Sequence, residues 1–105
     1  MIVTAWNNGK HNKSGAGYGL KVSVQDRDAN FSRAWDSVTI KLPDGTQVAS
    51  NINKSSFWSD KCRELINKEF GHWLIDNGYA PWQKGRPPKF ELTRVSDNQF
   101  RLDEK

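Results

Sequence analysis

The sequence has one cysteine, one methionine and no long hydrophobic run. A lone cysteine, Cys62, cannot form a disulfide within the chain, so the fold must be stabilised by packing, as is typical of a reducing compartment. No apolar run approaches the roughly 20 residues that a membrane-spanning helix needs. Residues 1–6 also lack the basic segment and apolar core of a secretory signal. These absences predict a cytoplasmic protein with no membrane partner.

Aliphatic residues are also scarce, and aromatic residues take their place. Hydrophobic residues make up 35% of the 105 residues, but among them are five tryptophans, five phenylalanines and two tyrosines. Aromatic side chains bury more area per residue than aliphatic ones, and one core suffices for a chain of this length. We therefore expect residues 1–105 to form a single folded domain.

Alternating apolar residues predict strands on both sides of one helical segment. Residues 2–6, 18–24, 38–42 and 46–52 have strand character, and Pro43-Asp44-Gly45 closes the latter two into a hairpin. Residues 90–92 and 100–102 predict a second hairpin. Between these strands, residues 9–17 are expected to form a mobile loop. Residues 26–37 are expected to form a long connection with one helical turn.

The helix is predicted from apolar residues that recur at spacings of three and four and end at Asn77-Gly78. These residues are Trp58, Cys62, Leu65, Ile66, Phe70, Trp73 and Leu74. The resulting order is β-β-β-β-α-β-β, and strands joined by turns pair antiparallel. We therefore expect an α+β fold: an antiparallel curled sheet or partial barrel of about six strands packed on one amphipathic helix. The pattern does not distinguish an open sheet from a closed barrel.

Motifs that could support catalysis or cofactor binding are incomplete. Residues 15–19, Gly-Ala-Gly-Tyr-Gly, precede a strand, whereas phosphate-binding glycine loops precede a helix. Pro43-Asp44 lacks the acid-x-Lys element of metal-dependent nucleases, and Asp26-Arg27-Asp28 lacks further ligands at a defined spacing. Two histidines and one cysteine are too few for a zinc site. We expect no cofactor and no metal, and an enzyme is the least favoured class.

The isolated reactive residues have structural interpretations. Cys62 falls in the apolar stripe of the predicted helix, which favours a buried, inert thiol. His72 falls on the polar face of the same helix, and His11 lies in the first glycine-rich loop. Neither histidine has a cysteine or serine at a spacing that indicates catalysis.

The net charge of +4 is concentrated in two loops that contain no acidic residue. Cations neutralise phosphates and aromatic rings stack on bases, so the mixture predicts a binding module for nucleic acid or another anionic partner. The candidate residues are Lys10, His11, Lys13, Tyr18, Trp82, Lys84, Arg86 and Lys89. The alternatives are a protein-interaction domain or accessory subunit that docks a partner through an exposed Trp/Pro segment, and a purely structural role for Tyr18 and Trp82.

Overall fold

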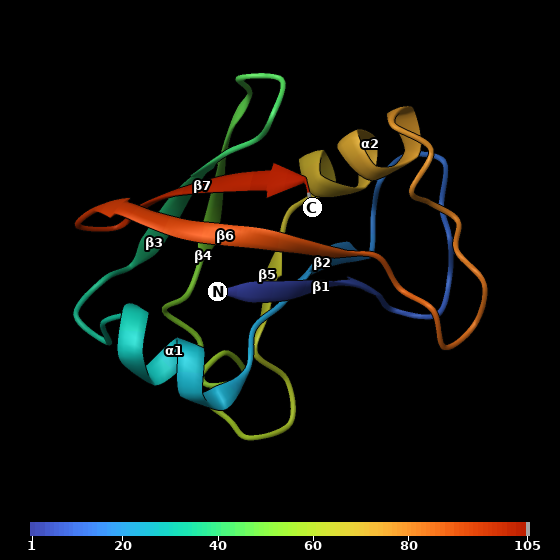
Figure 1. Ribbon diagram of the computed structural model, residues 1–105. Coiled ribbons are helices and arrows are strands. Elements are labelled where there is room, and N and C mark those ends of the chain that lie inside the picture. Colours follow the sequence, from blue (N-terminus) through green and yellow to red (C-terminus); the bar gives the residue numbers. More distant parts are fainter. Residues whose placement is uncertain (105) are drawn as a thin grey trace.

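The computed structural model describes residues 1–104 as seven strands and two helices (Figure 1). In chain order these are β1 (Ile2–Asn7), β2 (Tyr18–Lys21), α1 (Val24–Asn30), β3 (Ser37–Lys41), β4 (Gln47–Asn51), β5 (Glu64–Ile66), α2 (Lys68–Asp76), β6 (Lys89–Ser96) and β7 (Gln99–Glu104). The α+β class and the curled sheet are confirmed, but the sheet has seven strands in place of about six, is mixed where an antiparallel sheet was predicted, and is accompanied by two helices in place of one.

All strands belong to one sheet with the order β4-β3-β7-β6-β1-β2-β5. Both predicted hairpins are present, and every neighbouring pair is antiparallel except β3 and β7, which run parallel. The β6–β7 hairpin pairs with β1 through β6, so its other strand, β7, lies beside β3 and runs in the same direction as β3.

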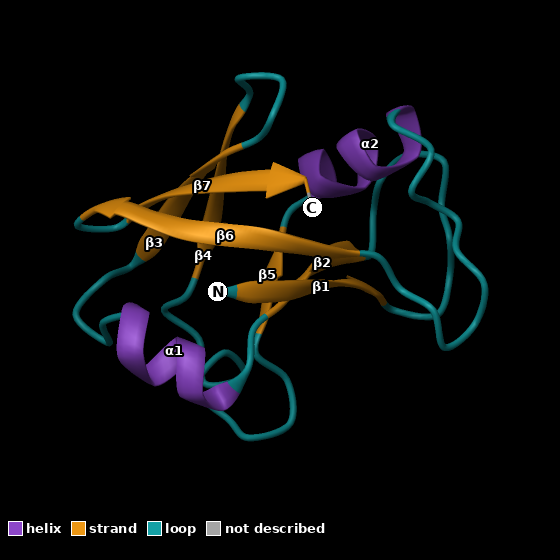
Figure 2. Cartoon of the chain, viewed as in Figure 1, coloured by secondary structure: helices purple, strands orange, loops and turns teal. Residues whose placement is uncertain are grey.

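The two edge strands of this sheet, β4 and β5, approach each other and nearly close it into a barrel (Figure 2). Side chains bridge the seam. The Asn67 amide donates to the Ala49 carbonyl at 2.7 Å, and the Ser50 hydroxyl donates to the Ile66 carbonyl at 3.5 Å. Side-chain hydrogen bonds thus link β4 and β5, which share no backbone hydrogen-bond pairing.

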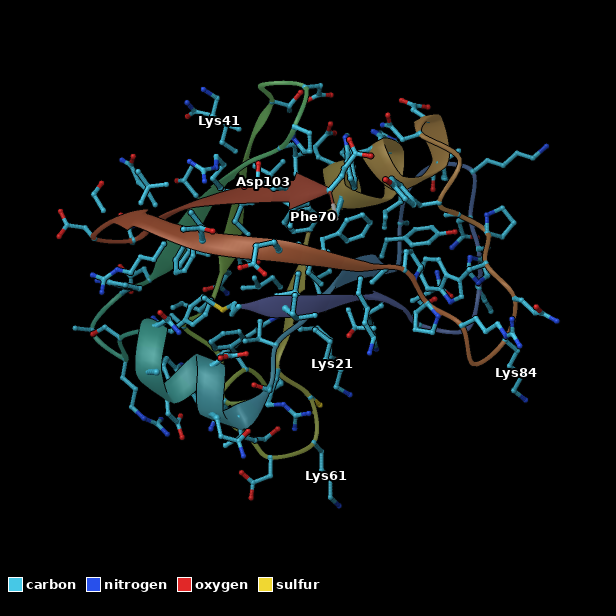
Figure 3. All side chains as sticks on the ribbon, in the orientation of Figure 1. Lys21, Lys41, Lys61, Phe70, Lys84 and Asp103 are labelled. Carbon is cyan, nitrogen blue, oxygen red and sulfur yellow. The ribbon has the colours of Figure 1, made fainter. Side chains whose placement is uncertain are left out.

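The barrel interior is one hydrophobic cluster, to which the strands contribute alternate residues. Val3 and Ala5 point inward from β1, while Phe70 enters from α2 and is 1% exposed (Figure 3). The predicted burial of Leu65, Phe70 and Trp73 is confirmed. None of the helices in residues 1–104 is long and apolar enough to cross a membrane.

The predicted helix is correct only in its second half. Its first half holds an irregular segment and the three-residue strand β5, in which Leu65 is buried and Ile66 is 40% exposed on the opposite face. The Asn67 side chain accepts a hydrogen bond from the Glu69 backbone N–H and caps α2. The apolar spacing that suggested one long helix therefore comes from two elements: side chains alternate between faces in the strand β5, and they recur with the helical repeat in α2.

Residues 52–63 connect β4 to β5 and are held by a second helix, α1, which the sequence predicted only as a single turn. Arg27 of α1 is buried and donates to the carbonyls of Phe57 and Ser59 at 3.0 and 2.7 Å. Cys62 is half-buried in this connection, so the prediction of a buried thiol on a helix stripe is wrong.

Strand directions place the two helices at opposite ends of the barrel. α1 follows β2 at the end where β1 begins, and α2 follows β5 at the end where β1 finishes. The connections 8–17 and 79–88 both lie at the α2 end (Figure 1). This end of the barrel therefore gathers both predicted basic loops.

Candidate nucleic-acid interface

The two basic loops, residues 8–17 and 79–88, meet through their aromatic rings although they are far apart in the sequence. The ring of His11 lies 5.0 Å from that of Trp82, edge to face, and Trp82 lies 5.8 Å from the buried ring of Tyr18. The blue and orange loops lie side by side in Figure 1. The structure thus brings together the two segments that the sequence identified separately.

The first loop begins with a turn and is packed against α2, although the sequence predicted it to be mobile. The Asn7 side chain accepts from the Gly9 N–H and donates to the Lys10 carbonyl, each at 2.8 Å. Further along, the backbone of Gly15 is buried against Gly71 of α2, where a Cβ on Gly71 would lie 2.2 Å from the Gly15 carbonyl oxygen. Two glycines face to face therefore allow this contact.

The second loop is fixed at both ends. The backbone N–H groups of Tyr79 and Ala80 donate to the Leu74 carbonyl at the end of α2 at 2.9 and 3.1 Å. At the other end, the Ala5 N–H of β1 donates to the Pro88 carbonyl at 2.9 Å. Its central residues are thereby held beside the outer face of β1.

Tyr18 is 1% exposed, so its ring is not available to stack on a base, and the alternative of a structural role fits this position. Strand β2 turns the Tyr18 ring into the core, and its hydroxyl lies 2.6 Å from Nδ1 of His11. Burial raises the pKa of the Tyr18 hydroxyl above its usual value. The buried Tyr18 hydroxyl thus contacts the His11 ring from the side of the core, while Trp82 is half-buried at the surface.

A groove of about 730 Å³ opens between β1 and the two loops. Its lining includes three aromatic or imidazole side chains and one cation, and consists of Ala5, Trp6, Asn7, Gly9, His11, Trp82, Lys84, Gly85 and Pro87. Trp6 was not among the predicted site residues. The strand alternation contains the signal, because Val3 and Ala5 point inward and Trp6 must then point outward.

One of the cations predicted for the site lines this groove, and the others lie on nearby segments of the chain. Lys84 lines the groove, and Figure 3 shows its side chain extending from the second loop. The remaining four lie on the same two loops or at the start of β6. All five are exposed, and none forms an ion pair within residues 1–104: Lys10, Lys13, Lys84, Arg86 and Lys89. Of sixteen basic residues, these five leave eleven elsewhere in the chain against twelve acidic residues. The positive excess of the protein therefore resides at this site.

The remaining titratable residues singled out from the sequence do not line the groove. His72 is half-exposed on α2, with Nδ1 3.4 Å from the Glu69 carboxylate. Asp44 sits in the β3–β4 turn and accepts from the Thr46 N–H at 2.8 Å, a bond that lowers the pKa of this carboxyl. Within the part of the chain that the structure describes, no three His, Cys, Asp or Glu side chains are grouped to hold a metal ion.

The chain matches no family model, and no curated protein or solved structure is significantly similar to it.

Proposed function

We propose that this protein is a small, non-enzymatic module that binds nucleic acid through the groove and the cations around it. One observation carries the proposal: the fold joins two distant, acid-free basic loops around a groove lined by aromatic rings. Unpaired cations attract phosphates and release condensed counterions, and rings at the same place can stack on bases.

The environment of His11 supports binding over catalysis. His11 lies against the Tyr18 hydroxyl on one ring nitrogen and packs edge-on against Trp82. These contacts orient the ring, and within residues 1–104 no serine, threonine or cysteine is hydrogen-bonded to His11 for it to activate as a nucleophile. His11 therefore serves to hold the aromatic wall of the groove in place. The proposal also places the module in the cytoplasm, in keeping with its single free cysteine.

The test is the salt dependence of binding to fluorescently labelled single- and double-stranded DNA and RNA. Each phosphate neutralised contributes about 0.7 to 0.9 to the slope of log K against log salt, so about four contacts give a slope near 3. Replacing Lys84 and Arg86 together with alanine should lower this slope by about 1 to 2. The matched control is K41A/K61A, which removes the same charge from exposed sites away from the groove (Figure 3).

The proposal requires that K84A/R86A weaken binding more than K41A/K61A, with similar thermal midpoints for both. Equal losses would indicate general attraction to a basic protein and would contradict a localised site. If no oligonucleotide binds at low salt, the nucleic-acid function fails, and a protein partner recognised through residues 79–88 becomes the leading proposal.

A further inference from the structure

Trp6 is half-buried like Trp35, Trp58 and Trp82, but it differs from them in having no aromatic ring or cation packed against its indole. Arg94 lies over the Trp35 ring at 5.0 Å, and Arg33 lies over the Trp58 ring at 4.6 Å. Trp82 packs edge-on against His11. Within residues 1–104, by contrast, Trp6 has no aromatic or cationic partner, although it lines the groove.

The strand register explains why no side chain on β2 packs on the Trp6 indole. Its neighbour on β2 is Gly19, which has no side chain to lay over the indole. Gly19 cannot be larger, because a Cβ there would lie 2.4 Å from the Leu65 carbonyl oxygen of β5. On the other side of β1, the register that pairs Thr4 with Lys89 brings Trp6 opposite Pro87, which also lines the groove. The outer face of β1 therefore presents beside the groove a half-buried indole that no aromatic ring or cation occupies.

The chemistry of the groove selects the kind of ligand that can use this ring. Indole rings also bind organic cations, but Lys84 in the lining and the four cations around it repel a positive ligand. A volume of about 730 Å³ lies in the range of small-molecule sites and is open to solvent along the loops. A flat, uncharged ring attached to a phosphate can stack on the aromatic side chains of the groove while its phosphate pairs with the cations.

We propose that the groove binds one unpaired nucleotide base, which stacks on Trp6 while its phosphate faces Lys84. This inference rests on the proposed function and narrows it to nucleic acid with a base outside the helical stack. A base within a paired duplex keeps both faces covered by its neighbours, so it cannot offer a face to Trp6 without leaving the stack. Single strands and bases extruded from a duplex present the same chemistry.

The first arm of the test compares four labelled DNA ligands with the unmodified protein. These are a single strand, its perfectly paired duplex, the duplex with one bulged thymidine, and the duplex with an abasic residue in the bulge. The single strand, the thymidine bulge or both should bind at least about 5-fold more tightly than the paired duplex, because stacking of one base is worth that much or more. The abasic bulge should resemble the paired duplex. Whichever of the two tight ligands binds identifies the source of the base.

The second arm removes the ring. Trp6→Ala should weaken binding of the preferred ligand by roughly 5- to 150-fold and leave paired-duplex binding unchanged. Trp6→Phe should retain most of the affinity, because a ring remains. The control is Ile66→Ala, which truncates an exposed side chain on β5, across Gly19 and outside the lining of the groove. Thermal unfolding of each variant shows whether it is folded.

The outcomes separate this inference from the proposed function. Binding that depends on Lys84 and Arg86 but is equal for paired, bulged and abasic duplexes would overturn the base site and leave the nucleic-acid function standing. Equal losses in Trp6→Ala and Ile66→Ala would also overturn it. Should Trp6→Ala fail to fold, the four ligands with the unmodified protein decide the question alone.

Discussion

Replacing Gly71 with alanine tests whether α2 holds the first basic loop in place. Alanine should favour the helix by about 1 kcal/mol relative to glycine. The new Cβ, however, would lie 2.2 Å from the Gly15 carbonyl oxygen and 2.5 Å from its Cα, so the loop backbone must move. Overpacking of this kind costs about 1 to 3 kcal/mol.

These opposing effects predict a small net change in stability and a large change in the loop. The free energy of unfolding of Gly71→Ala should fall by about 0 to 2 kcal/mol. Hydrogen exchange should accelerate at amides bonded within the loop, such as Asn8, which donates to Gly17, and Gly15, which donates to Asn12. Affinity for nucleic acid should fall, because His11 and Lys13 lose their positions.

The assay is hydrogen exchange by mass spectrometry together with DNA binding. Asp76→Ala is the control, because it introduces alanine at an exposed position of the same helix that does not touch the loop. Unchanged exchange over residues 8–17 and unchanged affinity in Gly71→Ala would refute the reasoning that this contact positions the loop.

Three further predictions concern stability. Phe70→Ala should lower the free energy of unfolding by about 3 to 5 kcal/mol in urea titrations, because it leaves a cavity at a ring that is 1% exposed; a loss below 1 kcal/mol would contradict this packing. Arg27→Met should cost at least about 1.5 to 3 kcal/mol, since it strands the carbonyls of Phe57 and Ser59, and a variant as stable as the parent would argue against that bond pair. Burial raises the pKa of Tyr18, and a hydrogen bond to Glu104 raises the pKa of Tyr79. Each hydroxyl therefore holds its proton more tightly in the folded state, and this contribution to stability is present below the unfolded pKa near 10 and is lost as the pH rises further. Urea midpoints measured from pH 8 to 11 should therefore decline less steeply in Tyr18→Phe, and identical slopes would show that Tyr18 is not involved.

Local patterns predicted most of the fold. Alternation in residues 38–42 and 46–52 and the Pro-Asp-Gly turn between them identified the β3–β4 hairpin, because a turn and two half-buried strands are encoded within a few residues. The closure of the barrel depends instead on how the irregular connection 52–63 brings β5 back beside β4, which no local pattern describes. The strand β5 was missed since its three residues fit a helical spacing that continues into α2.

The candidate site was predicted in part, for a related reason. Charge and glycine content marked both loops, and these are properties of single segments. That the loops meet depends on β1 pairing with both β2 and β6, which no local pattern reveals. The prediction included Tyr18 among the binding residues, with a structural role as the alternative, and did not name Trp6, although strand alternation places Tyr18 with the buried Leu20 and Trp6 opposite the buried Ala5.

The five tryptophan indole N–H signals offer the most direct measurement of where nucleic acid binds. The experiment would record them in a two-dimensional NMR spectrum of the folded protein, assign them with single Trp→Phe variants, and follow them while single-stranded DNA is added. A groove between the two basic loops predicts that the signals of Trp6 and Trp82 shift with the backbone amides of residues 84–86, while those of Trp35 and Trp58 stay in place. Shifts confined to Trp35 and Trp58, which lie under arginines elsewhere on the barrel, would contradict the proposed site.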